Sequence, residues 1–229
     1  IVFGRGFGAV LGQGAYRAAQ QIGRGTLELV AHVKKQEVPL HDPRIKHALD
    51  LGYAMSPNGA DHMHNIHDPG FTTPAGVAGM ANFGIRQPLP VTDLSPAKVL
   101  VATRYISLRV LQNCLGECMF MTHSWNAHRD VIAAATGWDF SHLEMLEAGE
   151  RIQAMARVFN QRAGLSGADD VAPPVFSQPT PAGPNAGVAV PAEALAPALD
   201  TYADLMGWDR ETGAPHTWKL HQLGLGWLA

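Results

Sequence analysis

Histidines crowd one short stretch of this 229-residue sequence. Five of them fall between residues 41 and 67: His41, His47, His62, His64 and His67. The spacing of the last three would let their imidazoles converge on zinc or iron, but the stretch has no cysteine and its acidic residues follow no known ligand pattern. An imidazole titrates near neutral pH, so the stretch more strongly favours a pocket histidine that transfers protons.

The two cysteines, Cys114 and Cys118, are the other residues that could bind a metal. They are four residues apart and could face one side of a helix, and Gly116 would let the backbone approach a bulky group. Two thiolates are fewer than the four that an iron–sulfur cluster takes. A lone cysteine is commonly a core residue, so residue types alone favour a buried thiol.

Composition restricts the class of protein. With 46% hydrophobic and 16% charged residues, the chain can bury a core. A net charge of -3 provides no basic field for nucleic acid, and no apolar run approaches the roughly 20 residues that cross a bilayer. Two cysteines are too few for a disulfide-stapled secreted scaffold, so we expect a cytoplasmic protein. The start at Ile1, without Met or a signal peptide, is interpreted as a truncation.

The elements that must position these residues are predicted to be helices. Apolar residues recur at three- and four-residue steps, and a short last helix ends near Leu223. Ser141 and Glu144 form a capping-box pattern, and Pro191 suits a first helical position. Glycine ends two of the helices, at Gly23 and Gly207. The periodic stretches are 10–22, 98–112, 141–159 and 191–207.

The remaining segments have other patterns. Residues 26–38 indicate a strand or a buried extended segment, and residues 41–96 indicate long loops with short helices. Residues 164–191 are rich in Pro and Gly, so we expect a surface segment without a packed element. In Gly137-Trp138-Asp139 and Gly207-Trp208-Asp209, each glycine is predicted to cap a helix in the left-handed conformation, with the tryptophan packing back.

A series of phrases, taken in order, resembles the aldehyde ferredoxin oxidoreductase family. The resemblance covers nearly the whole chain, and the order of the phrases carries more weight than any one of them. Two examples are Asn58-Gly59-Ala60-Asp61-His62 and Leu115-Gly116-Glu117-Cys118-Met119-Phe120. The others lie within 8–14, 31–39, 41–44, 51–54, 136–139, 149–152, 159–164, 202–209 and 220–225.

The resemblance implies an all-α fold of the multihelical C-terminal domains of that family, with long loops. Residues 1–38 would end the second domain, residues 39–229 would form the third, and residues 164–191 would be its Pro/Gly-rich surface segment. The family's N-terminal β domain is missing here. The N-terminal remainder of the same polypeptide is therefore an expected partner, and a homo-oligomer is compatible with this organisation.

The resemblance also implies two cofactors, a tungsten (or molybdenum) bis-pterin and a [4Fe-4S] cluster. Cys118 matches the family's fourth cluster ligand, whereas the upstream run with the other three cysteines is absent. His62 matches the histidine near the metal, which makes it the expected catalytic residue. The expected cofactor-binding residues are Asn58, His64, Asn113, Glu117 and Met119.

Several of these positions depart from the family's pattern. Asn113 stands where an aspartate holds a pterin, so a neutral amide replaces a charged acceptor. Glu117 replaces a leucine. Asn58 and His64 stand where better-known members carry basic residues that face the pterin.

The implied activity is oxidation of an aldehyde to a carboxylic acid, with electrons leaving through the cluster to ferredoxin or another electron carrier. Two alternatives stay open. One is a cofactor-free helical structural or interaction module derived from the family. The other is a histidine-bound metal hydrolase that uses His62 and His64.

Overall fold

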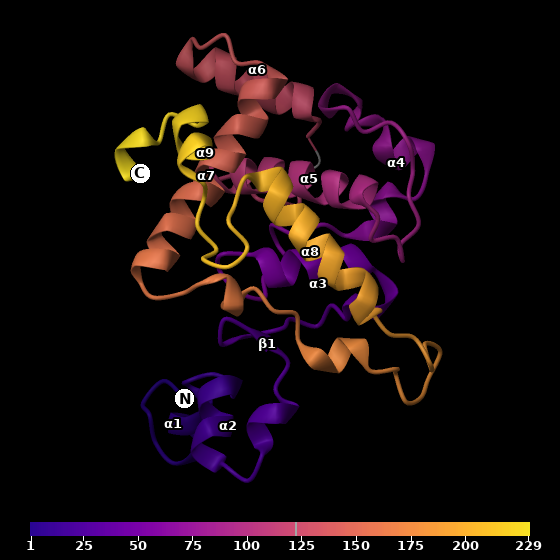
Figure 1. The fold of residues 1–229 in the computed structure, drawn as a ribbon, viewed down its shortest axis with the longest axis vertical. Coiled ribbons are helices and arrows are strands. Elements are labelled where there is room, and N and C mark those ends of the chain that lie inside the picture. Colours follow the sequence, from indigo (N-terminus) through magenta and orange to yellow (C-terminus); the bar gives the residue numbers. More distant parts are fainter. Residues whose placement is uncertain (122) are drawn as a thin grey trace.

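The computed structural model describes residues 1–121 and 123–229, and the described residues are mainly helical (Figure 1). This confirms the predicted all-α class. The elements are α1 (Phe7–Leu11), α2 (Ala15–Ile22), β1 (His32–Val33), β2 (Gln36–Glu37), α3 (His47–Met55), α4 (Pro74–Ala78), α5 (Pro96–Cys114), α6 (Trp125–Thr136), α7 (His142–Arg162), α8 (Ala192–Met206) and α9 (Thr217–Gln222). None of the described helices has the length and hydropathy that crossing a membrane requires.

Three long helices, α5, α7 and α8, form the centre of the molecule, and α3 packs against α5 and α8 (Figure 1). Leu108 of α5, Met145 of α7 and Tyr202 of α8 are almost completely buried in their shared core. Gly149 allows α7 to lie directly on α5, because a Cβ there would stand 2.0 Å from the Ser107 carbonyl oxygen. Only glycine fits such a close approach.

Helix α3 is buried along its entire length, from His47 to Met55. It is one of the short helices predicted among the loops of 41–96, although its position was not predicted. A helix enclosed on all sides lacks the one-sided apolar stripe that marks a surface helix, so its sequence carried no clear periodic signal. The following loop packs tightly on it, because a Cβ at Gly52 would overlap the side chain of Asn65.

The N-terminal part differs from the prediction in two places. The helix expected over 10–22 is divided into α1 and α2, because Gly14 takes a φ of 85° that interrupts helical geometry. Gly23 ends α2, as predicted. The segment 26–38 contains a 3-10 turn over Thr26–Leu29 and then the antiparallel hairpin of β1 and β2.

The other predicted helices are present. Ser141 and Glu144 make both bonds of the capping box of α7, and α8 begins directly after Pro191, which is its N-cap, and ends at left-handed Gly207. The short last helix is α9. Helix α6 was not predicted, because it buries only His128 and Ile132 and has too narrow an apolar face.

The Pro/Gly-rich segment 164–191 contains no α-helix or strand among its described residues, but it has two 3-10 turns. Its composition predicted no packed element, yet Asp170, Phe176 and Val190 are buried. The prediction for the two Gly-Trp-Asp sequences was right for the glycines and for one of the two tryptophans. Both glycines take the left-handed conformation, whereas Trp208 packs into the core and Trp138 is 63% exposed.

Candidate functional site

A cavity of about 130 Å³ lies between the loop that follows α3 and the helices α5, α7 and α8. Most of its polar residues come from that loop and from the end of α5, and α7 adds Gln153. Three of the residues predicted to bind cofactor, Asn58, His64 and Asn113, therefore line one cavity. The other polar side chains in its wall include Asp61 and Cys114, and its apolar wall consists of Ile106, Val110, Ile152, Ala156 and Tyr202.

Asp61 and His64 form an ion pair in the wall of this cavity. His64 Nδ1 lies 2.8 Å from Asp61 Oδ2, and both side chains are largely buried. The hydrogen bond with Asp61 raises the pKa of His64, although burial opposes this. Burial would raise the pKa of Asp61, but hydrogen bonds from His64 and from the Met63 backbone lower it to about 2. The pair favours an imidazolium that can donate to an anionic or electron-rich group.

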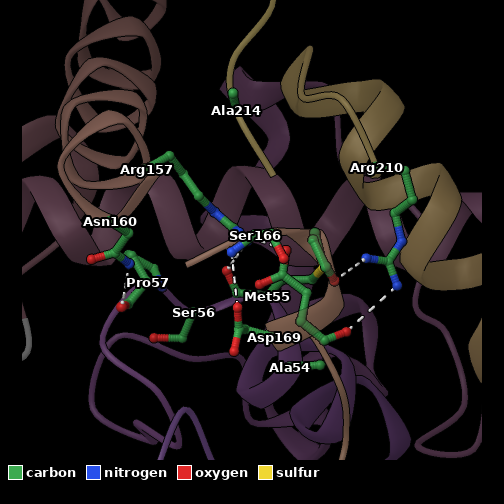
Figure 2. A network of polar contacts seen from close by, with 12 residues as sticks. Ala54, Met55, Ser56, Pro57, Arg157, Asn160, Ser166, Asp169, Arg210 and Ala214 are labelled. Carbon is green, nitrogen blue, oxygen red and sulfur yellow. Dashed lines mark hydrogen bonds and ion pairs between the residues drawn. The ribbon is translucent and has the colours of Figure 1, made fainter. Parts of the chain in front are cut away.

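A buried ionic network fixes the start of the loop that carries Asn58 and His64. Arg157 of α7 donates to the Met55 carbonyl at 2.7 Å and to Asp170 at 2.6 Å, and Lys34 pairs with the same aspartate at 2.7 Å. Asn160 donates to the Pro57 carbonyl at 2.8 Å. Figure 2 shows Arg157 and Asn160 reaching from α7 towards Met55 and Pro57. One wall of the cavity is therefore attached to α7.

His62, the expected catalytic residue, belongs to a second group of side chains outside the lining of this cavity. We call His41, Lys46, His62 and His67 the histidine–lysine cluster. The His41 and His62 rings are 4.5 Å apart, and the His41 and His67 rings are 5.0 Å apart. His67 Nε2 donates to the His62 carbonyl at 3.2 Å. His62 thus lies beside the imidazoles of His41 and His67, and these two in turn contact the ammonium group of Lys46.

Burial and the neighbouring Lys46 lower the pKa of His67 to about 4. The pKa of His41 is lowered by the same two causes. Both imidazoles are therefore neutral near pH 7. His41 and His67 can each accept one hydrogen bond and donate one, whereas protonated imidazoles would only donate.

Cys118 lies on the segment that follows α5, and its side chain is exposed. Cys114, at the end of α5, is exposed too, so the expectation of a buried thiol from residue types was wrong. Arg109 of α5 holds the segment by donating to the Met119 carbonyl at 3.4 Å. Glu117 Oε2 lies 2.7 Å from His128 Nε2 of α6. Glu117, Cys118 and Met119 thus lie outside the lining of the cavity that holds Asn58, His64 and Asn113.

His62 and His64 do not converge. His64 pairs with Asp61 in the cavity wall, whereas His62 lies against His41. The described part of the chain has no group of three His, Cys, Asp or Glu side chains arranged to hold a metal ion. The geometry therefore does not support the histidine-bound metal hydrolase, because His62 and His64 do not point to a common metal position.

Two residues of these groups were missed by sequence reasoning. Asp61 was noted only as an acidic neighbour, although an Asp-x-x-His spacing in a loop can indicate a hydrogen-bonded pair. Lys46 carried no signal, because its partner His67 is 21 residues away and meets it only through the fold.

Comparison with known proteins identifies relatives along nearly the whole chain. The family model described as aldehyde ferredoxin oxidoreductase, domains 2 & 3, matches residues 1–225. The tungsten-containing aldehyde ferredoxin oxidoreductase of Pyrococcus furiosus is 34% identical over 224 residues, which are 96% of this chain and 34% of that protein. Its Thermococcus kodakarensis counterpart is 33% identical over 98% of the chain and 35% of its own length. The chain thus spans about a third of these curated relatives.

A solved structure has a similar fold. It is the active site complex BamBC of benzoyl coenzyme A reductase in complex with 1,5-dienoyl-CoA, with a TM-score of 0.65 and 20% sequence identity. The alignment covers 97% of this chain and 37% of the other. At this identity the match supports the multihelical fold alone.

Proposed function

Because the chain belongs to the aldehyde ferredoxin oxidoreductase family, we propose that it is the C-terminal part of an enzyme that oxidises an aldehyde to a carboxylic acid. The cofactor would be a tungsten (or molybdenum) bis-pterin. The observation that carries the proposal is the cavity in which Asn58, His64 and Asn113 meet. Relatives that contain tungsten support the choice of metal.

The residues of the cavity fit a pterin. Asn58 and Asn113 carry amides that can both donate to and accept from the polar edges of a heterocycle. His64, with its pKa raised by Asp61, suits a phosphate or a ring nitrogen. At about 130 Å³ the cavity is smaller than pockets that enclose whole ligands, which hold roughly 300 Å³ or more. We therefore assign these residues to one wall of the cofactor site.

His62 would transfer the proton. Oxidation of an aldehyde to an acid adds oxygen from water and releases protons, and an imidazole can accept one near neutral pH. The hydrogen bond from His67 to the His62 backbone and the neighbouring His41 ring would keep the imidazole in place. The chemistry that the bound metal and cluster would supply is the removal of two electrons from the substrate and their passage to ferredoxin or another carrier.

Cys118 would supply one thiolate to a [4Fe-4S] cluster. Its exposed side chain is free to meet ligands from outside this chain. A cluster takes four ligands, so the other three would come from the remaining two-thirds of a longer polypeptide, as the coverage of the relatives suggests. In that polypeptide we place residues 1–38 at the end of the second domain and residues 39–229 in the third. A homo-oligomer is compatible with this arrangement.

Metal analysis tests the proposal. The longer polypeptide, purified without oxygen from cells supplied with tungstate and molybdate, should contain tungsten or molybdenum together with iron and an extractable pterin. The double variant Asn58→Leu and Asn113→Leu should lose pterin and metal but keep its helical circular dichroism. A wild-type protein with neither metal nor pterin would contradict the proposal and favour the cofactor-free helical module.

A further inference from the structure

Lys46 is a buried ammonium group whose two side-chain partners are imidazoles. It is 9% exposed, and its Nζ lies 3.2 Å from His41 Nδ1 and 3.0 Å from His67 Nδ1. A lysine ammonium only donates hydrogen bonds, so both Nδ1 atoms must accept. His41 and His67 are therefore neutral, and neither balances the charge of Lys46.

The carboxylate that attracts Lys46 is ion-paired with another lysine. Asp68 raises the pKa of Lys46, but its Oδ1 accepts from Lys98 Nζ at 2.9 Å in a completely buried ion pair, and no hydrogen bond joins Asp68 to Lys46. Within the described residues, Lys46 makes no ion pair with a carboxylate. Two ammonium groups thus share one carboxylate, which leaves a surplus of one positive charge.

A buried unpaired charge is costly, and a bound counter-ion removes much of that cost. The effect on Lys46 is visible in its pKa, which burial lowers although Asp68 opposes the shift. Lys46 has three N–H groups and donates two of them to His41 and His67. The third is free to bind an anion, and the partly exposed His41 and His62 give solvent access to the group.

We propose that the histidine–lysine cluster is a binding site for the carboxylate group of a small organic acid. One carboxylate balances the one surplus charge, and its oxygens accept from the ammonium N–H and from an imidazole N–H. A phosphate dianion would add a second negative charge among neutral imidazoles. In the enzyme proposed above, the ligand would be the acid product or a carboxylate on the substrate, held beside His62; this part alone rests on the proposed function.

Binding can be measured on the 229-residue chain without cofactor. With the histidine rings labelled with ¹³C, sodium acetate is added at pH 7 and constant ionic strength, with sodium chloride and acetamide as controls. Acetate should shift the His41 and His67 signals with a saturable dependence, whereas chloride and acetamide should not. Lys46→Met should weaken acetate binding at least about tenfold, since a charge-assisted bond is lost. The exposed Lys35→Met is the matched control and should bind normally.

Several outcomes would overturn the proposal. These are no saturable shift in the wild-type chain, equal weakening by Lys35→Met, or inorganic phosphate binding more tightly than acetate, which would indicate a phosphate site. If Lys46→Met fails to fold by circular dichroism, Lys46→Arg replaces it and should keep acetate binding within a few-fold. Acetate binding is measured without cofactor, so it does not depend on the proposed function. If the longer enzyme does not oxidise aldehydes, the acetate result still holds. If the chain does not bind acetate, the proposed aldehyde oxidation is unaffected.

Discussion

His64 Nδ1 lies 2.8 Å from Asp61 Oδ2 in the wall of the cavity that also contains Asn58 and Asn113. The pair shifts the two pKa values in opposite directions, with His64 raised and Asp61 lowered to about 2. The folded chain therefore keeps an imidazolium–carboxylate pair over a wider pH range than separate side chains would.

The first prediction concerns pH and stability. The pKa of His64 is raised above 6.5 in the folded state. The stabilisation that His64 contributes to folding is therefore complete below pH 6.5 and is lost as the pH rises through the pKa of the folded state. The difference in free energy of unfolding between wild type and His64→Gln should shrink from pH 6 to pH 8.5. Urea unfolding of both chains measures it.

For Asp61, the pH dependence of the stabilisation has the opposite sign. With its pKa lowered from 3.8 to about 2, the stabilisation is present above pH 4 and is lost as the pH falls towards 2. Asp61→Asn should therefore approach wild-type stability only in acid. A difference that stays constant with pH in both variants would show that the pair does not form in solution.

The second prediction concerns Arg157, which joins α7 to the end of α3. Replacing it with Met would leave the buried Asp170 short of a cation and the Met55 carbonyl without its donor. Because breaking a buried ion pair costs roughly 3–5 kcal/mol, Arg157→Met should lower the free energy of unfolding by about that amount. Arg162→Met, an exposed position on the same helix, should change stability by less than about 0.5 kcal/mol. Equal effects in urea unfolding would contradict the role given to Arg157.

The third prediction concerns Asp50, which is completely buried on α3 and has no hydrogen-bond partner for its carboxyl among the described residues. Burial, with a smaller effect of Asp42, raises its pKa from 3.8 to about 8. Between these values the folded state holds a proton that the unfolded state lacks, so stability falls as the pH rises.

Asp50→Asn cannot ionise and removes this dependence. The free energy of unfolding of the variant minus that of wild type should increase by about 2 kcal/mol or more from pH 4 to pH 8. Above pH 8 this difference should stay constant. Thermal unfolding across that range tests it, with the exposed Asp130→Asn as control. A flat difference would mean that Asp50 is hydrated or paired in solution.

Long helices with one exposed face could be predicted from the sequence, because α7 and α8 each combine an apolar stripe with a local start or stop signal such as Ser141 or Gly207. The position of α3 could not be predicted, since burial on every side removes the periodicity. The cavity was predicted in part. Asn58, His64 and Asn113 came from the family resemblance, whereas the contact of Lys46 with His67 depends on how α3 meets a loop 21 residues later.

The fourth prediction separates the two cysteines. In the longer enzyme, Cys118→Ser should diminish the visible absorbance of the iron–sulfur cluster, because a cluster needs its thiolate ligands. Cys114→Ser should leave the absorbance nearly intact, since Cys114 has no counterpart in the family's pattern. Both thiols are exposed, so neither change should disturb the core. Equal loss in the two variants would reject the assignment of Cys118.

The most direct test of the account is aldehyde-dependent reduction of a viologen dye by the longer enzyme, with His62→Asn compared to wild type. If His62 transfers the proton, turnover should fall by roughly a hundredfold or more, while tungsten and iron contents stay near those of wild type. His64→Asn is the comparison variant. Because His64 lies in the cavity wall that we assign to the cofactor, its turnover should fall only in proportion to the tungsten that it loses. Unchanged turnover in His62→Asn, or its abolition by His64→Asn with cofactor retained, would contradict the role of His62.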